Sequence, residues 1–234
     1  MSLVTAENLT KVYGMGEIEV EALKSVSFRI EPASFISFIG PSGSGKTTLL
    51  NLIGCLDKPT SGILKVADVN TSDLTRKKAA AFRGNNLGFI FQDFNLIPVL
   101  TVYENVEYPL LIVKNVPAEE RKNRVISLLK TVGMIDQKNK YPDQISGGQK
   151  QRVAVARALV TNPRLVLADE PTANLDSKTA FMVIDIMRQM KEEFGVTFIF
   201  STHDPKIVSE VEAVYTLQDG MLIGRSQKEG GRHA

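Results

Sequence analysis

Apolar residues recur in short runs along the first 70 positions, and turn-forming residues separate these runs. Runs of this length, bounded by glycine, proline, asparagine or serine, are typical of strands. Four strands are expected here, at 2–9, 22–30, 34–40 and 61–69. The segment 45–56 predicts a helix after the third of them, and 86–92 predicts a further strand that ends at Gln92.

Helical spacing replaces the strand pattern from residue 93 to about residue 140. Segments 101–113 and 118–132 repeat their apolar residues at helical intervals. Pro117 suits the start of the second segment and Gly133 suits its end, because proline fits a first helical turn and glycine a C-cap. We therefore expect a helical insertion between two α/β parts.

Strands return at 164–169 and 196–202, with a helix predicted between them at 176–195. The apolar residues of that helix keep to one face, and Asp176 or Ser177 can cap its start. Continuous apolar strands that alternate with helices imply a parallel sheet covered on both faces. Ligands of such sheets bind at the carboxyl ends of the strands.

The last part of the chain departs from this alternation. Residues 213–224 predict a hairpin that turns at Asp219 and Gly220. The polar tail 226–234 is expected to be mobile. The sequence contains no internal repeat and no low-complexity tract, so a solenoid or a fibrous protein is not indicated.

The composition is that of a globular protein and disfavours several classes of function. Of 234 residues, 43% are apolar and 23% are charged, and the net charge of +2 gives no basic field for nucleic acid. No run approaches the ~18 apolar residues that a membrane span needs, and the N-terminal residues do not resemble a signal peptide. Cys55, the one cysteine, is expected to be a buried thiol in a reducing compartment.

A phosphate-binding loop stands between the strand at 34–40 and the helix at 45–56. The segment "GPSGSGKTT" fits the pattern Gly-x-x-x-x-Gly-Lys-Ser/Thr in the strand–loop–helix context that it requires. Its N–H groups can surround phosphate oxygens, Lys46 can reach the β- and γ-phosphates, and the Thr47 hydroxyl can bind Mg²⁺. The residues predicted to bind nucleotide are Gly40, Pro41, Ser42, Gly43, Ser44, Gly45, Lys46, Thr47 and Thr48.

Two adjacent carboxylates follow the strand at 164–169. A buried strand that ends in Asp169 and Glu170 needs a solvent contact or a partner for each charge. Asp169 can hold Mg²⁺ directly or through water. Glu170 can polarise the attacking water, and a positioned base of this kind contributes roughly 10²–10⁴-fold in rate.

Polar or aromatic residues near the ends of other strands complete the candidate site. His203 follows the strand at 196–202 and is expected to contact the γ-phosphate or the attacking water. Gln92 can reach Mg²⁺ or that water. Tyr13 precedes a glycine-bearing loop and can stack on the base, with packing in the core as the alternative.

Paired glycines open another predicted helix, in the segment "ISGGQKQRVAVARAL". Glycine is a poor helix former, so Gly147 and Gly148 need a reason at this position. The free N–H groups of a helix N-terminus, with a partial charge of roughly +0.5, attract anions. We therefore expect Ser146, Gly147 and Gly148 to face an anion.

Taken in order, these motifs resemble those of the nucleotide-binding subunits of ABC transporters, and the match covers nearly the whole chain. The motifs are "GPSGSGKTT", "FQ", "ISGGQ", "LADEPT", "NLD" and "STHD". The stretches "GCLDKPTSG", "FQDFNLIPVLTVYENVEYPL" and "ARALVTNPRLVLADEPTANLDSKT" look like the lipoprotein-release and macrolide-export subfamily, whose members work with FtsX-like permeases.

The resemblance implies an α/β fold with a phosphate-loop NTPase core, an antiparallel β subdomain and a helical signature subdomain. A single domain would span residues 1–234, with the core and β subdomain at about 1–92 and 156–234 and the helical subdomain at about 93–155. It implies an ATPase that uses ATP and Mg²⁺ to drive a membrane permease for export or lipoprotein release. Such a subunit lies on the cytoplasmic side of the inner membrane, held there by the permease.

The resemblance also implies a head-to-tail homodimer that ATP brings together. Ser146 lies 100 positions after Lys46, beyond the helical insertion, and the resemblance implies that its helix faces the nucleotide of the other chain. Ser146, Gly147 and Gly148 would then face the γ-phosphate across the dimer, and Gln149 would reach the ribose or cap the helix. Asp176 of the "NLD" motif is placed at the nucleotide on the same basis.

Three departures from the family pattern concern local structure. Ile145 stands where leucine is usual, which is a conservative apolar change. The segment "EPASF" has Ala33 and Ser34 where a glycine turn is common, which puts the geometry of that turn in doubt. Asn174 stands where many members have alanine or glycine. Because no catalytic position is missing, we expect an active ATPase.

One apolar segment and one basic cluster allow more than one interpretation. Five apolar residues of a predicted loop could receive a permease or could form a local core. They are Phe94, Leu96, Ile97, Pro98 and Leu100. Lys150, Arg152 and Arg157 suggest nucleic acid, but their spacing on a helix favours contacts with carboxylates or phosphates of the protein and its nucleotide.

The alternative function is that of a non-transport ABC ATPase in DNA repair or translation. Heads of the DNA-repair class contain a long coiled coil between the phosphate loop and the signature, and no sustained heptads occur in that interval here. Translation factors of the class carry two such domains in one chain, and this chain has one. A transport subunit without a nucleic-acid partner is therefore favoured.

Overall fold

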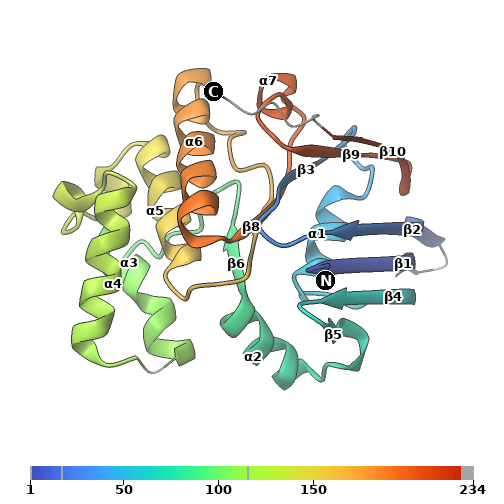
Figure 1. The fold of residues 1–234 in the computed structure, drawn as a ribbon, viewed down its shortest axis with the longest axis horizontal. Coiled ribbons are helices and arrows are strands. Elements are labelled where there is room, and N and C mark those ends of the chain that lie inside the picture. Colours follow the sequence, from blue (N-terminus) through green and yellow to red (C-terminus); the bar gives the residue numbers. More distant parts are fainter. Residues whose placement is uncertain (1, 17, 115, 228–234) are drawn as a thin grey trace.

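The structure of the protein is a computed structural model that describes residues 2–16, 18–114 and 116–227. Two sheets and a group of helices form the molecule, with the helical part at one end and most of the strands at the other (Figure 1). Most of the tail expected to be mobile, residues 228–234, lies outside the described residues. Within the described part of the chain no helix is both long enough and apolar enough to cross a bilayer.

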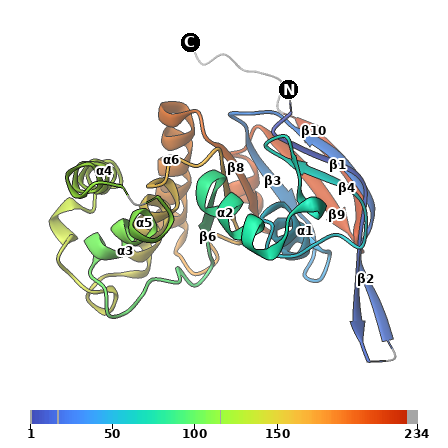
Figure 2. The ribbon, with the colours of Figure 1, turned by 90° about the horizontal axis from the view of Figure 1, so that it is seen from below.

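The first sheet is antiparallel and has the strand order β2-β1-β4-β5. Its strands are β1 (Val4–Met15), β2 (Ile18–Ile30), β4 (Ser61–Val66) and β5 (Val69–Asn70). This sheet confirms the antiparallel β subdomain. β1 and β2 are longer than expected, because beyond the body of the sheet they pair with each other as a hairpin that projects from the molecule (Figure 2).

The second sheet is parallel except at one edge and has the order β10-β9-β3-β8-β7-β6. Its strands are β3 (Phe35–Ile39), β6 (Leu87–Ile90), β7 (Leu165–Ala168), β8 (Thr197–Ser201), β9 (Ala213–Gln218) and β10 (Met221–Gln227). β9 and β10 form the expected hairpin, whose strands pair antiparallel. The apolar runs of β3, β7 and β8 are almost entirely buried, as strands covered on both faces require.

Alternate residues of the central strands belong to two separate cores. Phe198 and Phe200 of β8 pack with the helical side, whereas Ile199 between them packs with the antiparallel sheet and α1 (Lys46–Ile53). In the same way, Val166 of β7 belongs to the first core and Leu167 to the second. The parallel sheet is therefore covered on both faces, and its strand ends remain free to form a site.

The helical part gathers α3 (Val102–Pro109), α4 (Ala118–Thr131) and α5 (Gly147–Leu159) at one side of the molecule (Figure 1). The helix expected over 101–113 is α3 followed by a π-helical turn, Leu110–Lys114. The change coincides with Pro109, which has no N–H to continue the ladder of α-helical hydrogen bonds.

The long helix α6 (Ser177–Phe194) begins at the cap Asp176, whose Oδ1 accepts a hydrogen bond from the N–H of Thr179 at 3.1 Å. It ends at Gly195, which has a positive φ of 63°. The helix α2 (Arg76–Asn86) was not predicted from the sequence, because only Ala79 and Phe82 of this helix are buried and they define no apolar stripe.

Short helices complete the chain. They are α7 (Pro205–Val208) and the 3-10 turns Thr71–Asp73, Ile135–Gln137 and Pro142–Gln144. The turn before β3 keeps the left-handed conformation that glycine favours, with a φ of 54° at Ala33. Ala33 therefore adopts a backbone conformation that glycine would adopt without strain. Cys55 is buried, as expected.

Candidate functional site

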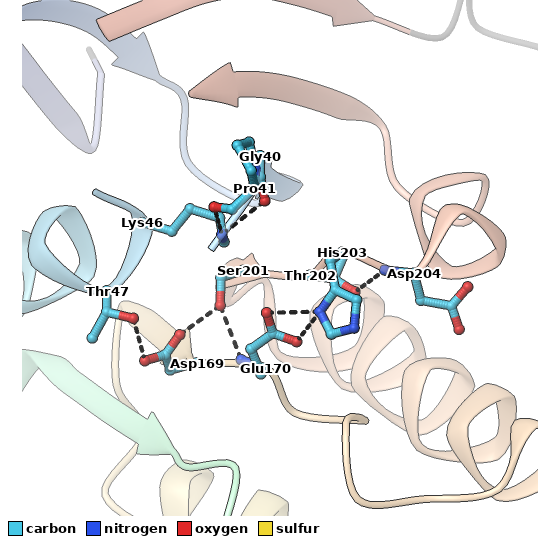
Figure 3. A network of polar contacts seen from close by, with 10 residues as sticks. All are labelled: Gly40, Pro41, Lys46, Thr47, Asp169, Glu170, Ser201, Thr202, His203 and Asp204. Carbon is cyan, nitrogen blue, oxygen red and sulfur yellow. Dashed lines mark hydrogen bonds and ion pairs between the residues drawn. The ribbon is translucent and has the colours of Figure 1, made fainter. Parts of the chain in front are cut away.

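Most of the residues of the phosphate loop, together with Gln92, Asp169, Glu170 and His203, meet in a pocket of about 780 Å³ beside the carboxyl ends of the parallel strands. Its wall includes the phosphate loop before α1, Gln92 after β6, the acidic pair after β7, and His203 after β8. Figure 3 shows the polar contacts that join most of these groups. The position agrees with the rule that ligands of such sheets bind at the strand ends.

The phosphate loop adopts a backbone that requires glycine at two points. The φ angles are 150° at Gly40 and 100° at Gly45. A Cβ added at Gly40 would lie 2.0 Å from the carbonyl oxygen of Leu217, and one at Gly45 would lie 2.6 Å from that of Ala22. The helix that follows, α1, has no side-chain cap, so its first N–H groups are free to bind an anion.

Lys46 holds its ammonium group inside the loop. Its Nζ donates hydrogen bonds to the carbonyl oxygens of Gly40 and Pro41, both at 2.9 Å (Figure 3). An ammonium group has three N–H donors, so one remains after these two bonds. The loop therefore has a fixed positive charge at the position where a phosphate chain would lie.

A line of hydrogen bonds runs from the phosphate loop to the acidic pair. The Thr47 hydroxyl donates to Oδ2 of Asp169 at 2.9 Å, and the Ser201 hydroxyl donates to Oδ1 of the same carboxylate at 2.6 Å. The Ser201 oxygen in turn accepts the N–H of Glu170 at 2.9 Å. Ser201 is the first residue of the "STHD" motif, but the sequence alone gave it no role; its place as the last strand residue before His203 is the signal that could have indicated one.

Glu170 and His203 face each other at the mouth of the pocket. Nδ1 of His203 lies 2.7 Å from Oε2 and 3.0 Å from Oε1 of Glu170. The backbone of Glu170 is left-handed, with a φ of 48°, which is uncommon for a residue with a Cβ. The turn after β8 is held by the N–H of Asp204, which donates to the Thr202 hydroxyl at 3.1 Å.

The donor set fits a nucleotide with Mg²⁺. Thr47, Gln92 and Asp169 offer a hydroxyl, an amide and a carboxylate on the pocket wall. Mg²⁺ is bound by one or two carboxylates together with substrate phosphates. That mode suits this site, because no group of three or more His, Cys, Asp or Glu side chains in the described part of the chain could hold a metal alone. The buried Ser44 hydroxyl in the loop also lacks a hydrogen-bond partner within those residues.

Tyr13 stands on β1 in a fixed orientation outside the lining of the pocket. Its hydroxyl donates to Oδ2 of Asp57 at 2.8 Å, and Nζ of Lys11 lies 4.7 Å from the centre of its ring. Nζ of Lys11 also lies 2.8 Å from Oδ1 of Asp57. Burial and the contact with Asp57 raise the pKa of Tyr13. The ring is 36% exposed and does not belong to the core, so stacking on a base stays a prediction.

Ser146 and Gln149 cap α5 through reciprocal hydrogen bonds. The Ser146 hydroxyl accepts the N–H of Gln149 at 3.4 Å, and Oε1 of Gln149 accepts the N–H of Ser146 at 2.9 Å. Gln149 was expected to reach the ribose or to cap its helix, and in the structure it caps the helix. None of the residues 146–149 is among those that line the pocket of their own chain, and neither is Asp176, which caps α6.

Gly148 has a structural role as well. A Cβ added there would lie 2.2 Å from Cγ2 of Thr179, so its absence lets α5 and α6 approach each other. Packing of α5 against α6 therefore explains Gly148 without a ligand.

Arg152 and Arg157 bind backbone carbonyls, so the expectation that they contact carboxylates of the protein is wrong. Arg152 donates to the carbonyl oxygen of Val132 at 3.1 Å, at the end of α4. Arg157 donates to the carbonyl oxygen of Phe94 at 2.7 Å and to that of Asn95. The last carbonyls of a helix and those of a loop lack partners of their own, and arginine supplies the donors. Burial lowers the pKa of Arg157.

The apolar loop after Gln92 serves partly as local core. Leu96 packs against the helical core, while Pro98 remains exposed. The loop is held by the buried Asn105, whose side chain accepts the N–H of Ile97 at 2.7 Å and donates to the carbonyl oxygen of Leu100 at 2.9 Å. Beside the loop lies a groove of about 350 Å³, whose lining includes Phe91, Asn95, Pro109, Val113 and Arg157.

Several residues of the main pocket gave no signal in the sequence. Ala22 and Lys24 of β2 reach it together with Asp219 and Gly220 of the β9–β10 turn. The N–H of Lys24 donates to the carbonyl oxygen of Gly220 at 2.8 Å, and the N–H of Gly220 donates to that of Ser44 at 3.2 Å. These backbone contacts join both sheets to the phosphate loop.

Comparison with known proteins places this site in a family. The family model described as ABC transporter matches residues 23–173. The ABC transporter ATP-binding protein MJ0796 of Methanocaldococcus jannaschii is 45% identical over 232 residues, which cover 98% of each chain. A structure of the MJ0796 dimer in a post-hydrolysis state, bound to ADP and Pi, aligns with a TM-score of 0.89 over 97% of this chain and 100% of that one, at 43% identity.

Two of the relatives are named for a transport function. The lipoprotein-releasing system ATP-binding protein LolD of Legionella pneumophila is 42% identical over 223 residues, which cover 95% of this chain and 98% of the relative. The macrolide export ATP-binding/permease protein MacB of Syntrophobacter fumaroxidans is 42% identical over 231 residues, which cover 98% of this chain and 32% of the relative.

Proposed function

The chain belongs to the ATP-binding subunits of ABC transporters and is an ATPase, and from this premise we propose that it drives an FtsX-like permease for export or lipoprotein release. The likeness to LolD and to the ATP-binding part of MacB supports this subfamily. The subunit would lie on the cytoplasmic side of the inner membrane, held there by the permease.

The hydrogen-bonded line from Thr47 to Glu170, with His203 against Glu170, carries the assignment of roles. Lys46 and the loop N–H groups bind the phosphates. Glu170 polarises the attacking water, and His203 orients Glu170 or contacts the γ-phosphate. Thr47, Gln92 and Asp169 would hold Mg²⁺, which supplies charge neutralisation at the phosphates when bound.

Two chains would complete each site. Ser146, Gly147 and Gly148 lie outside the pocket of their own chain, as a role toward a partner's nucleotide requires. The dimeric MJ0796 structure supports this arrangement. The N-terminus of α5 would then place its partial positive charge at the γ-phosphate of the partner's ATP, with Gln149 and Asp176 beside it.

The groove lined by Phe91, Asn95, Pro109, Val113 and Arg157 is the proposed site for the permease. Leu111 and Ile112 stand in the chain between the groove residues Pro109 and Val113, and they are 45% and 65% accessible. Exposed apolar surface next to a groove favours a partner with an apolar segment. The loop 93–95 connects this groove to Gln92, so docking of the permease would be linked to the nucleotide site.

A membrane pulldown tests the permease assignment. The tagged subunit is mixed with detergent-solubilised membranes of its source, and the retained proteins are identified by mass spectrometry. We expect a multi-span permease of the FtsX-like type, and we expect Ile112→Asp to lose it. The matched control is Ile223→Asp, because Ile223 is 56% exposed on β10, at the opposite edge of the parallel sheet.

Other outcomes would contradict the proposal. Retention of nucleic acid or ribosomes in place of a permease would favour the non-transport ABC ATPases. If Ile112→Asp and Ile223→Asp lose the permease to the same extent, the groove is not its docking site.

A further inference from the structure

Ser201 is a buried polar residue to which the sequence motifs assign no role. It is the last residue of β8, the strand that lies between β3 and β7, and its side chain is 0% exposed. A buried hydroxyl is retained at low cost only when it is hydrogen-bonded. The Ser201 hydroxyl makes two hydrogen bonds, one with the side chain of Asp169 and one with the N–H of the next residue, Glu170.

The two hydrogen bonds can have only one direction. A carboxylate only accepts and an N–H only donates, so the Ser201 hydroxyl must donate to Asp169 and accept from Glu170. The distances are 2.6 Å to Oδ1 of Asp169 and 2.9 Å from the nitrogen of Glu170. One hydroxyl therefore fixes a side chain and the neighbouring main chain together.

The contact with Asp169 decides what the second carboxylate oxygen can do. With Oδ1 held by Ser201, Oδ2 points at the Thr47 hydroxyl, 2.9 Å away. Thr47 and Asp169 are two of the three residues that the proposed function assigns to Mg²⁺. The orientation of the carboxylate thus depends on a residue 32 positions further along the chain.

The contact with Glu170 supports a strained backbone. The φ of 48° at Glu170 lies in the left-handed region, which residues with a Cβ adopt rarely. Conformations of this kind persist when the surroundings hold them. The Ser201 oxygen holds the N–H of that residue, and the resulting turn directs the Glu170 carboxylate toward His203, 2.7 Å away.

We propose that Ser201 is a positioning residue for ATP hydrolysis, which aligns the Asp169 carboxylate and the Glu170 main chain through one buried hydroxyl. The inference rests on the roles proposed above for Asp169 and Glu170. It concerns the rate of the chemical step and the use of Mg²⁺, and leaves the phosphate loop unaffected.

The test compares Ser201→Ala, Ser201→Val and Ser201→Thr by kcat, KM and the dissociation constant of ATP with Mg²⁺ and with EDTA. Valine and threonine have the same shape, so any cost of the added methyl group is shared and only the hydroxyl differs. We expect kcat to fall about 10- to 100-fold in the alanine and valine variants, since a small misplacement of catalytic groups can cost ~10²-fold. Threonine should restore most of the loss relative to valine.

Nucleotide binding supplies a readout besides activity. In EDTA the dissociation constant of ATP should stay near the wild-type value in all three variants. Addition of Mg²⁺ should tighten binding less in Ser201→Val than in Ser201→Thr, because the Asp169 carboxylate is no longer aligned.

Two residues of the same sheet provide matched controls. Ser37 of β3 and Thr197 of β8 are 0% exposed, and their hydroxyls have no hydrogen-bond partner within the described part of the chain. Ser37→Ala and Thr197→Val should therefore leave kcat unchanged. If the valine and threonine variants at position 201 do not fold, kcat of Ser201→Ala is compared with kcat of Ser37→Ala. A fall in kcat for Ser201→Ala alone would support the inference, and equal values would overturn it.

The outcomes separate this inference from the proposed function. If Ser201→Val hydrolyses ATP as fast as Ser201→Thr, or if Ser201→Ala lowers only the melting temperature, the inference is overturned. If Glu170→Gln keeps wild-type turnover, the assigned role of Glu170 fails instead. In the Glu170→Gln background, Ser201→Ala should remove only the contribution that Ser201 makes through Asp169, so its effect on the rate should be smaller than in the wild type. An effect of the same size in both backgrounds would show that Ser201 does not act through Glu170.

Discussion

At the scale of single residues, the site depends on which groups touch and which remain free. Lys46 is bonded to its own loop, Asp169 is held from two sides, and Glu170 is paired with a histidine that is 69% exposed. Glu170 is the one of these groups whose loss should separate binding from hydrolysis, because no contact of the phosphate loop involves its side chain.

The substitution Glu170→Gln should stop turnover and preserve ATP binding. Loss of the base removes the ~10²–10⁴-fold that such a group supplies, while the phosphate loop stays intact. A closed dimer should then accumulate with Mg-ATP, measured by gel filtration and light scattering. A variant that remains monomeric at saturating ATP would contradict the role assigned to Glu170, and Glu192→Gln on α6 is the control of the same chemistry.

The Cys55 thiol should make the stability of the fold depend on alkaline pH. Burial raises its pKa from 9.0 to about 11. Because the folded value lies above the unfolded one, the contribution to stability is fully present below pH 9 and is lost as the pH rises to about 11. Wild type should therefore lose more stability over that window than Cys55→Ala, measured by urea unfolding, and parallel curves would contradict the assignment.

At the scale of elements, the approach of α5 to α6 is set by the missing side chain at Gly148. Alanine is preferred to glycine inside a helix by up to about 1 kcal/mol, so propensity alone favours the substitution. The added Cβ would however lie 2.2 Å from Cγ2 of Thr179. Contact between the helices and helix propensity therefore act in opposite directions.

Gly148→Ala should lower the melting temperature, and Thr179→Ser should restore it in the double variant. Serine removes Cγ2 and keeps the hydroxyl that bonds to Oδ2 of Asp176 at 2.6 Å. The measurement is thermal unfolding of the two single variants and the double variant. Equal melting temperatures for Gly148→Ala and wild type would show that α5 and α6 adjust freely, and Thr179→Ser alone is the control.

At the scale of the whole molecule, two chains are needed if the signature acts on the partner's nucleotide. For a site assembled from dilute monomers, the ATPase rate should rise with about the square of the protein concentration before it levels off, as mass action requires. A rate strictly proportional to concentration, at levels where light scattering detects only monomer even with ATP, would contradict the shared site.

Mixed variants extend this test. Lys46→Ala and Ser146→Arg each break both sites of their own homodimer. In a mixed dimer the chain with Ser146→Arg offers an intact Lys46 to an intact Ser146, so one site is whole. Restored activity would support the arrangement in trans and show that one site can act alone. If no activity is restored, the dependence of the wild-type rate on protein concentration tests whether the site is shared.

Local patterns in the sequence determined much of this protein. The phosphate loop, the acidic pair after β7 and the amphipathic α6 were all predicted, because each depends on residues close together in the chain. The parallel sheet followed from apolar runs that alternate with helices, whereas the antiparallel sheet was expected only from the family resemblance. The weakly patterned α2 could not be found, because only two of its residues are buried.

Tertiary structure alone decided how these parts meet. Thr47 reaches Asp169 over 122 positions and Ser201 reaches it over 32, since the register of β7 beside β8 sets which strand ends are neighbours. Arg157 binds loop carbonyls more than 60 positions away, which no spacing on its own helix indicates. Periodicity reports which face of an element is buried, whereas hydrogen-bond partners distant in sequence are chosen by the packing of whole elements.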